Sequence, residues 1–288
     1  MKQLRYLMLA AAVPSVCVQA FEVDPGDYEA LPVGATIGVV YYQHSTTDSA
    51  YANGHKVSSD FKLTSNVGIL RLLHVYQLTD RLTLEPQFLL PFGRVSSSGD
   101  ASALGDTSGV GDLTLTAPLK YRLNDANDIL GATVYLTAPT GNYNRDDALN
   151  LGENRWKVDL QAAYVKHLGE KWAVDLVGDA IWYSDNDDFG SSSARREQEV
   201  SYGAQLMGRY IVDPGTSLAI GLGHTWGGEN QIDGTAQDDR AETTNFRVTA
   251  NKFFTAKDQL QVQLGRDLAV ENGPKENFRL NLRYVRVF

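Results

Sequence analysis

The chain has 288 residues, 43% of them hydrophobic, and a formal net charge of −9. This length suits one large domain or two small ones, and it is enough to bury a core of ordinary size. The 35 acidic and 26 basic side chains, with no Lys/Arg-rich run, argue against a nucleic-acid partner, which favours a basic surface.

The first twenty residues predict a secretory signal peptide. Lys2 and Arg5 precede an apolar stretch, 6–18, which is followed by "VQA", a small-residue cleavage sequence. The alternative is a buried N-terminal helix, which Pro14 and the cleavage-like end disfavour. We therefore expect 1–20 to be a signal peptide and 21–288 to form the mature domain.

Export does not imply a disulfide framework in this chain. Cys17 is the only cysteine and lies within the predicted signal, where Val16 differs from the small residue that a lipoprotein site requires. After residue 21, no stretch approaches the roughly 20 apolar residues of a membrane helix. Hydropathy alone would therefore describe a soluble exported protein.

The hydrophobic pattern nevertheless has the period of β-strands. Within 154–186, Trp156, Val158 and Leu160 alternate with Lys157 and Asp159. The same alternation recurs along the chain and predicts twelve strands. They cover 34–44, 61–78, 81–94, 109–122, 129–142, 154–167, 171–184, 198–212, 216–227, 242–255, 258–270 and 276–288.

The connections alternate in length. Short turns such as 213–215 join the strands at one end, and long, polar, acidic loops join them at the other. This alternation is typical of a meander of hairpins, which a soluble sandwich or a lipocalin-like barrel would also show.

Strand length and aromatic placement favour a membrane barrel. Most of the strands run for about 11–15 residues, longer than usual. Aromatic pairs about 20–25 Å apart bracket the apolar faces, as the two girdles of a lipid-facing band do. The pairs are Trp156 with Tyr164, Trp172 with Trp182, Tyr202 with Tyr210, and Phe246 with Phe254. We predict an all-β, transmembrane, antiparallel up-and-down β-barrel of twelve strands in the outer membrane of a Gram-negative bacterium.

The last strand carries an assembly feature. Phe278, Leu280, Leu282 and Tyr284 share one face with the terminal Phe288, and Arg286 interrupts that face. A terminal aromatic resembles the signal by which bacterial outer-membrane barrels are recognised for insertion. This resemblance implies the barrel-assembly machinery as a partner, with outer-membrane lipid and lipopolysaccharide around the barrel.

Some residues do not fit the alternation. Pro86 and Pro118 fall deep inside predicted strands, where proline removes a ladder donor. Pro91 and Pro139 fall near strand ends or bulges, and Arg71 lies among apolar residues of 61–78.

The charged residues that alternate with the apolar face are expected to line a lumen. A wet pore tolerates them, whereas lipid would penalise a midplane Arg or Lys by about 2–4 kcal/mol. They predict a conduit with both signs of charge on its wall, and the alternative is an interior closed by paired charges. The candidates are Glu85, Asp112, Lys120, Arg122, Lys157, Asp159, Asp175, Asp179, Arg209, Arg247, Asp267, Arg279 and Arg283.

Three segments carry a family resemblance. They are "PGDYEALPVGATIGVVYYQHSTTDSAYANG" (25–54), "GVGDLTLTAPLKYRL" (109–123) and "APTGNY" (138–143). The chain resembles the outer-membrane transporters labelled for the meta-pathway of phenol degradation, over essentially the whole mature part. The resemblance implies an outer-membrane barrel that admits hydrophobic or aromatic compounds, and it supplies no functional residues.

The sequence gives little support to catalysis or to metal binding. His224 falls on the lipid face, as in barrel phospholipases, but Trp226 occupies the position where their serine would stand. The segment 185–196 has the first spacings of a calcium loop, yet Phe189 and Arg196 replace ligands. "GVGDL" (109–113) lacks the Lys-Ser/Thr of a phosphate loop. No enzyme activity and no cofactor are therefore expected.

Four tyrosines cluster near the start of the mature chain. They could line an aromatic-binding mouth, but we favour the interpretation that they serve as girdle and loop residues. They are Tyr28, Tyr41, Tyr42 and Tyr51.

The function predicted from these features is passive uptake of small molecules, with hydrophobic or aromatic compounds favoured. One alternative is a structural or adhesive barrel with a closed lumen. The other is a phospholipase-like hydrolase.

Topology is the first testable prediction. With an even number of strands, both termini should be periplasmic and the five long loops external. Protease treatment of intact cells should therefore cut within 45–60, 96–108, 143–153, 185–197 or 228–241. Cuts at 168–170 or 213–215 would mean that the barrel is inserted the other way round.

Overall fold

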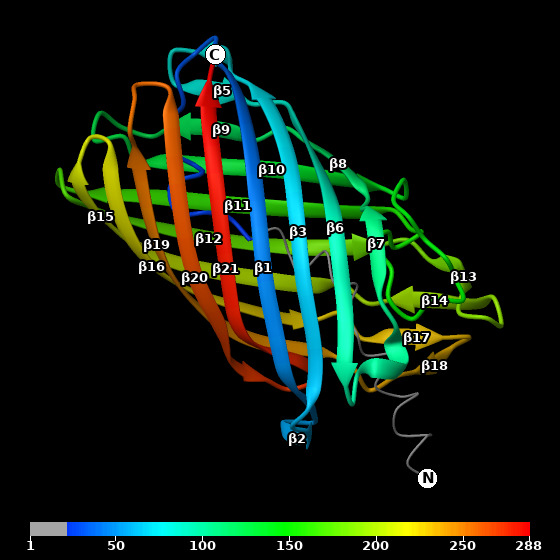
Figure 1. Ribbon diagram of the computed structural model, residues 1–288. Coiled ribbons are helices and arrows are strands. Elements are labelled where there is room, and N and C mark those ends of the chain that lie inside the picture. The colour runs from blue at the N-terminus through cyan, green and yellow to red at the C-terminus, as the bar shows by residue number, and fades with distance from the viewer. Residues whose placement is uncertain (1–21) are drawn as a thin grey trace.

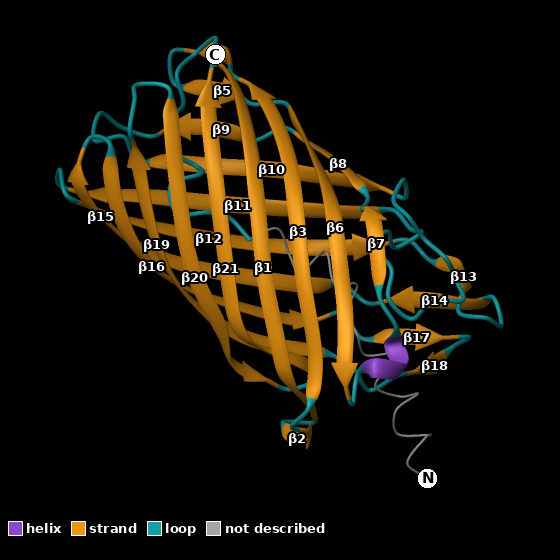
Figure 2. Ribbon diagram, viewed as in Figure 1, coloured by secondary structure: helices purple, strands orange, loops and turns teal. Residues whose placement is uncertain are grey.

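A computed structural model describes residues 22–288, so the predicted signal peptide, 1–20, lies outside the described residues. The chain forms a closed antiparallel β-barrel of twelve strands, as predicted (Figures 1 and 2). Several of these twelve are broken into shorter pieces. With the short strands of the loops included, the strands are β1 (Thr36–Ala52), β2 (His55–Ser58), β3 (Phe61–His74), β4 (Tyr76–Thr79), β5 (Leu82–Leu84), β6 (Gln87–Gly99), β7 (Thr107–Val110), β8 (Leu113–Thr116), β9 (Leu119–Arg122), β10 (Ile129–Ala138), β11 (Lys157–Leu168), β12 (Trp172–Tyr183), β13 (Asn186–Phe189), β14 (Ala194–Gln198), β15 (Ser201–Asp213), β16 (Thr216–Gly227), β17 (Asn230–Ile232), β18 (Thr235–Ala236), β19 (Ala241–Phe253), β20 (Asp258–Val270) and β21 (Gly273–Val287).

Pairing of the first strand with the last closes the barrel. β1 and β21 are antiparallel, in a register that runs from Ile37 opposite Val287 to Tyr51 opposite Gly273. β1 also pairs with β3, so each of its edges is occupied. In lipid, where no water can bond a free edge, this closure satisfies the backbone.

Prolines explain the broken strands. β5 ends before Pro86 and β8 ends before Pro118, so each strand restarts after a residue that cannot donate to the ladder. Pro91 lies within β6, where its carbonyl accepts the Gly111 N–H at 2.8 Å in the gap between β7 and β8. The wall between β6 and its neighbour is therefore less regularly bonded than the other walls.

The predicted boundaries differ from the structure mainly at the long-loop end. The first strand was expected over 34–44 but continues to Ala52, because β21 and β2 pair with its polar second half. The loops 185–197 and 228–241 contain β13, β14, β17 and β18, which form a separate four-stranded sheet. A single turn of 3-10 helix, Ser102–Leu104, lies in another of these loops. Among residues 22–288, no helix is long and apolar enough to span a membrane.

The alternation separates an outer apolar face from an interior. Leu176 is 47% exposed, while its neighbour Asp175 is 3% exposed. Arg286 does lie on the outer face, but it forms two hydrogen bonds with Asp258, at 2.7 and 2.8 Å, and Tyr284 donates to the same carboxylate. These contacts compensate the charge that interrupts the apolar surface of the last strand.

Residues 22–35, hereafter the inner segment, precede β1, and their first part, 22–29, lies inside the barrel, where it was not expected. The turn at 24–27 has proline at its second position and Gly26 at its third, with φ of 86°, as a type II turn requires. Val23 and Tyr28 pack against the inner faces of β10, β11, β12 and β15. The Tyr28 ring fits because Gly131 has no side chain: a Cβ there would lie 2.2 Å from the ring.

The closure by β21 generates the second prediction. Deleting residues 284–288 should abolish folded barrel in the outer membrane, because it leaves part of β1 unpaired in lipid. Phe288→Asp should lower the folded amount, and Phe288→Tyr, which keeps an aromatic ring, should preserve it. The measurement is the heat-modifiable band on electrophoresis. Normal folding of the five-residue deletion would contradict closure by this strand.

Candidate channel lumen

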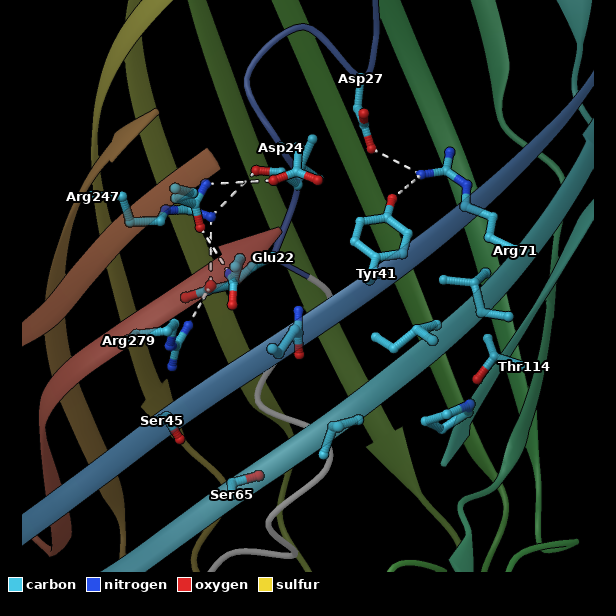
Figure 3. Close-up of a pocket in the computed structure, with 18 of the residues that line it drawn as sticks. Glu22, Asp24, Asp27, Tyr41, Ser45, Ser65, Arg71, Thr114, Arg247 and Arg279 are labelled. Carbon is cyan, nitrogen blue, oxygen red and sulfur yellow. Dashed lines mark hydrogen bonds and ion pairs between the residues drawn. The ribbon is translucent and has the colours of Figure 1, made fainter. Parts of the chain in front are cut away.

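The acidic side chains of the inner segment face basic side chains of the barrel wall (Figure 3). Glu22 accepts hydrogen bonds from Asn245 on β19 at 2.8 Å and from Arg279 on β21 at 2.6 Å. Arg247 on β19 lies 3.4 Å from the same carboxylate. One glutamate thus binds β19 and β21, the strands on either side of β20, to the start of the inner segment.

The turn of the inner segment is held from both sides of the barrel closure. Asp27 accepts from Arg283 on β21 at 2.5 Å and from Arg71 on β3 at 3.0 Å. Asp24 accepts from Arg283 at 3.1 Å and from Gln261 at 2.7 Å. The aspartates therefore connect β20 and β21 with β3, across the strand pair that closes the barrel.

Side chains of β9, β11, β12 and β15 hold the inner segment from the other side of the barrel. Arg209 bonds both Glu29 and Asp175, and Asp175 in turn accepts the N–H of Gly26 at 2.9 Å. His167 lies 3.0 Å from Glu29. The Lys120 ammonium donates to the carbonyls of residues 27 and 29 at 2.7 and 3.0 Å. Contacts with β3, β9, β11, β12, β15 and β19–β21 surround the segment.

Neighbouring arginines lower the pKa of two acids of the inner segment, Glu22 and Asp27. Burial would raise the pKa of Glu22, but Arg279 and Arg247 outweigh it and bring the pKa below its ordinary value. Burial acts in the same way on Asp27, and Arg283 and Arg71 hold the pKa of its carboxyl well below the usual range. The inner segment thus bears negative charges that match the positive charges around it.

A cavity of about 240 Å³ remains between the inner segment and one side of the barrel. Its polar boundary includes Asp27, Tyr41 and Arg71, and the Arg71 guanidinium donates to both of the others. Apolar side chains of β3, β6 and the break before β9 line the cavity beside these polar groups, since Tyr41 is the register partner of Ile69. The apolar residues there are Leu63, Val67, Ile69, Leu89, Pro91 and Pro118.

The structure places eleven of the thirteen predicted lumen residues in the interior as buried side chains and leaves Arg122 and Arg279 partly exposed. It brings Arg247, Arg279 and Arg283 together around the inner segment, and Lys120 beside Glu85 at 2.8 Å. Asp112 lies apart from them, where it accepts the N–H groups of residues 141 and 153. Asp159, Asp179 and Asp267 have no ion-pair partner within 4 Å among the described residues.

The sequence reasoning missed the inner segment and Arg71. One signal was present: three lumen arginines on 242–288 had only Asp267 to balance them, while 22–29 carries four acids without a strand pattern. Arg71 looked misplaced because its neighbours on the inner face, Ile69 and Leu73, are apolar. The inner face of β3 is in fact largely apolar, and it forms one wall of the cavity.

The tyrosines divide between two roles. Tyr28 and Tyr41 line the cavity, contrary to the interpretation that we favoured, whereas Tyr42 is 43% exposed on the outer face. His224 bonds Thr244 at 2.9 Å and stacks on Trp226. Within residues 22–288, no group of three or more His, Cys, Asp or Glu side chains is placed to hold a metal ion.

The ion pairs of Asp27 generate the third prediction. Asp27→Ala leaves two buried guanidiniums without their shared partner, which should weaken attachment of the inner segment by on the order of 3 kcal/mol. Single-channel recordings should then show a larger or more strongly fluctuating conductance. Asp125→Ala, which removes a carboxylate that is 96% exposed, is the matched control. Identical recordings for both variants would contradict a blocking role for the segment.

Comparisons with known proteins agree with this architecture. The family model described as "Putative MetA-pathway of phenol degradation" matches residues 46–284. A crystal structure of the COG4313 outer membrane channel from Pseudomonas putida F1 is 99% identical, with a TM-score of 0.92, and the match covers 93% of this chain and 100% of that one. No match was found among curated proteins.

More distant structures share the fold alone. The CymD monoaromatic hydrocarbon channel is 11% identical, with a TM-score of 0.54 and coverage of 96% of this chain and 94% of that one. The Pseudomonas putida toluene transporter TodX is 11% identical, with a TM-score of 0.51 and coverage of 97% of both chains. From the family match and the near-identical channel, this chain belongs to the phenol-degradation (MetA-pathway) family and is an outer membrane channel.

Proposed function

We propose that the channel admits small hydrophobic compounds, with single-ring aromatics as the favoured class, by passive diffusion through the cavity beside the inner segment. The observation that carries the proposal is the apolar wall of that cavity. Ile69, Val67 and Leu89 face an interior where a pore for ions and sugars would present polar groups. An apolar cavity of about 150 Å³ suffices for benzene, so 240 Å³ accommodates a substituted ring.

The polar boundary of the cavity supports the same class of compound. The Tyr41 hydroxyl and the Arg71 guanidinium, 3.0 Å apart, lie beside the apolar residues, since Tyr41 is the register partner of Ile69. A phenol or an aryl alcohol could place its ring on the aliphatic side chains and its hydroxyl toward this pair. Two barrels of the same fold are named as a monoaromatic hydrocarbon channel and as a toluene transporter, and this likeness agrees with the proposal.

Passage as proposed requires no catalysis and no cofactor. The role of the thirteen charged wall residues as a substrate path also belongs to this proposal. The surroundings that we propose are outer-membrane lipid and lipopolysaccharide, with the barrel-assembly machinery acting on β21. The inner segment limits the passage to compounds that fit beside it, which argues for a selective channel over a general pore.

A substitution at Ile69 generates the fourth prediction. Ile69→Gln keeps the side-chain size but adds an amide to the apolar wall, and it should reduce uptake of toluene or phenol about tenfold. Ile69→Leu, which conserves volume and polarity, should stay near the wild-type rate. Uptake of the radiolabelled compound is measured in a deletion strain that carries each variant at equal levels of folded barrel. Equal rates for both variants would contradict passage along this wall.

A further inference from the structure

Two carboxylates on adjacent strands of the barrel wall have no ion-pair partner among the described residues. Asp267 on β20 has none either, but it accepts the N–H of residue 276. Asp159 on β11 is 2% exposed and Asp179 on the adjacent β12 is 7% exposed. Among the residues that the structure describes, no hydrogen-bond donor reaches either carboxylate oxygen of Asp159 or the Oδ1 of Asp179. Asp179 receives only a long hydrogen bond, at 3.5 Å, from Gln161.

The two side chains share one place in the lumen. In the β11–β12 register, Gln161 lies opposite Asp179, and Asp159 is two residues further along the same face. Diagonal neighbours on one face of an antiparallel pair lie about 7–8 Å apart, close enough for like charges to repel each other. Because an isolated charge is expensive to bury, a pair of like charges without a partner requires a cation or a proton.

Neighbouring basic groups are already engaged. Lys157, two residues from Asp159, donates to Glu153 at 2.5 Å. The arginines of β19 and β21 are bound by Glu22, Asp24 and Asp27. The inner segment therefore neutralises the basic wall and leaves the two carboxylates at β11–β12 without a basic partner.

The two carboxylates lie close to Tyr28 of the inner segment. Gln161 accepts a hydrogen bond from the Tyr28 hydroxyl at 2.9 Å, so the inner segment reaches the level of Asp179, which is nearer to the short turn at 169–171 than Asp159 is. From Asp159 the strand continues through Lys157 toward the long loop at 143–153. An ion that came from the long-loop side would meet Asp159 first and would then reach Asp179 and Tyr28 at the same level of the barrel.

We propose that Asp159 and Asp179 bind a monovalent cation, such as an alkali-metal ion or a small ammonium ion, and make ion passage through this channel cation-selective. A monovalent cation compensates one of the two carboxylate charges, and the amide and phenol oxygens of Gln161, Tyr28 and Tyr135 lie nearby. Together these groups offer fewer ligands than the six to eight oxygens that Ca²⁺ takes. The inference goes beyond the uptake of hydrophobic compounds, and it requires only that the lumen admits ions.

The first test compares ion selectivity. Purified wild-type channel in a planar bilayer under a KCl gradient should give a zero-current potential of cation-selective sign. The double variant Asp159→Asn, Asp179→Asn, which conserves shape, should lower the K⁺/Cl⁻ permeability ratio about threefold or more. The control is Asp146→Asn with Asp187→Asn, which removes two exposed loop carboxylates and should leave the ratio unchanged.

The outcomes separate this inference from the proposed function. A wild-type channel that conducts without cation preference, or a double variant with unchanged selectivity, would show that the carboxylates are neutralised inside the protein and would overturn the inference. Neither result bears on toluene uptake, which is measured separately. If currents are too small to read, crystals soaked in thallium(I) acetate decide: anomalous density between the carboxylates supports the site, and its absence overturns it.

Discussion

Ion pairing between the inner segment and the barrel wall is the interaction on which the lumen depends. Buried arginines on β3, β19 and β21 would be costly to bury alone, and so would the acids of residues 22–29. Together they compensate one another, with Asp27 shared between two guanidiniums. This mutual requirement explains why a segment with no strand character is held inside a barrel.

The same arrangement divides the interior into regions of different chemistry. On the side of β19–β21, positive charges are balanced by the segment. On the side of β3 and β6, the wall is apolar and a cavity remains beside the segment. On the side of β11–β12, carboxylates are left without a partner. A single uniform pore would show none of these differences. The interior is better described as a selective passage whose shape is set by the inner segment.

Much of the fold could be predicted because a barrel in lipid imposes a strict two-residue period. Leu176 and Asp175 follow it, and so do the aromatic ends of β11 and β12, so strand number and facing emerged from the sequence alone. The lumen was predicted less well, since alternation shows which way a side chain points and does not show what it meets there. Arg71 and Ile69 point inward with opposite polarity, and only the folded structure shows that one binds Asp27 while the other borders the cavity.

The inner segment escaped prediction for a related reason. Its contacts join residues more than two hundred positions apart, as between Glu22 and Arg279, and no periodic pattern encodes them. Prolines 86 and 118, which conflicted with continuous strands, mark breaks that the barrel tolerates beside the cavity. The features that sequence rules could not place therefore gather around the passage itself.

Hydrogen exchange of residues 22–35 in the native channel, reconstituted in lipid nanodiscs and followed by mass spectrometry, tests the central claim most directly. The N–H groups of Val23 and Gly26 donate to Gln205 and Asp175 within the barrel, and the ion pairs hold the segment there. The account predicts exchange over minutes to hours, far slower than in the exposed loop at 143–148. Exchange of the inner segment as fast as that loop would contradict it.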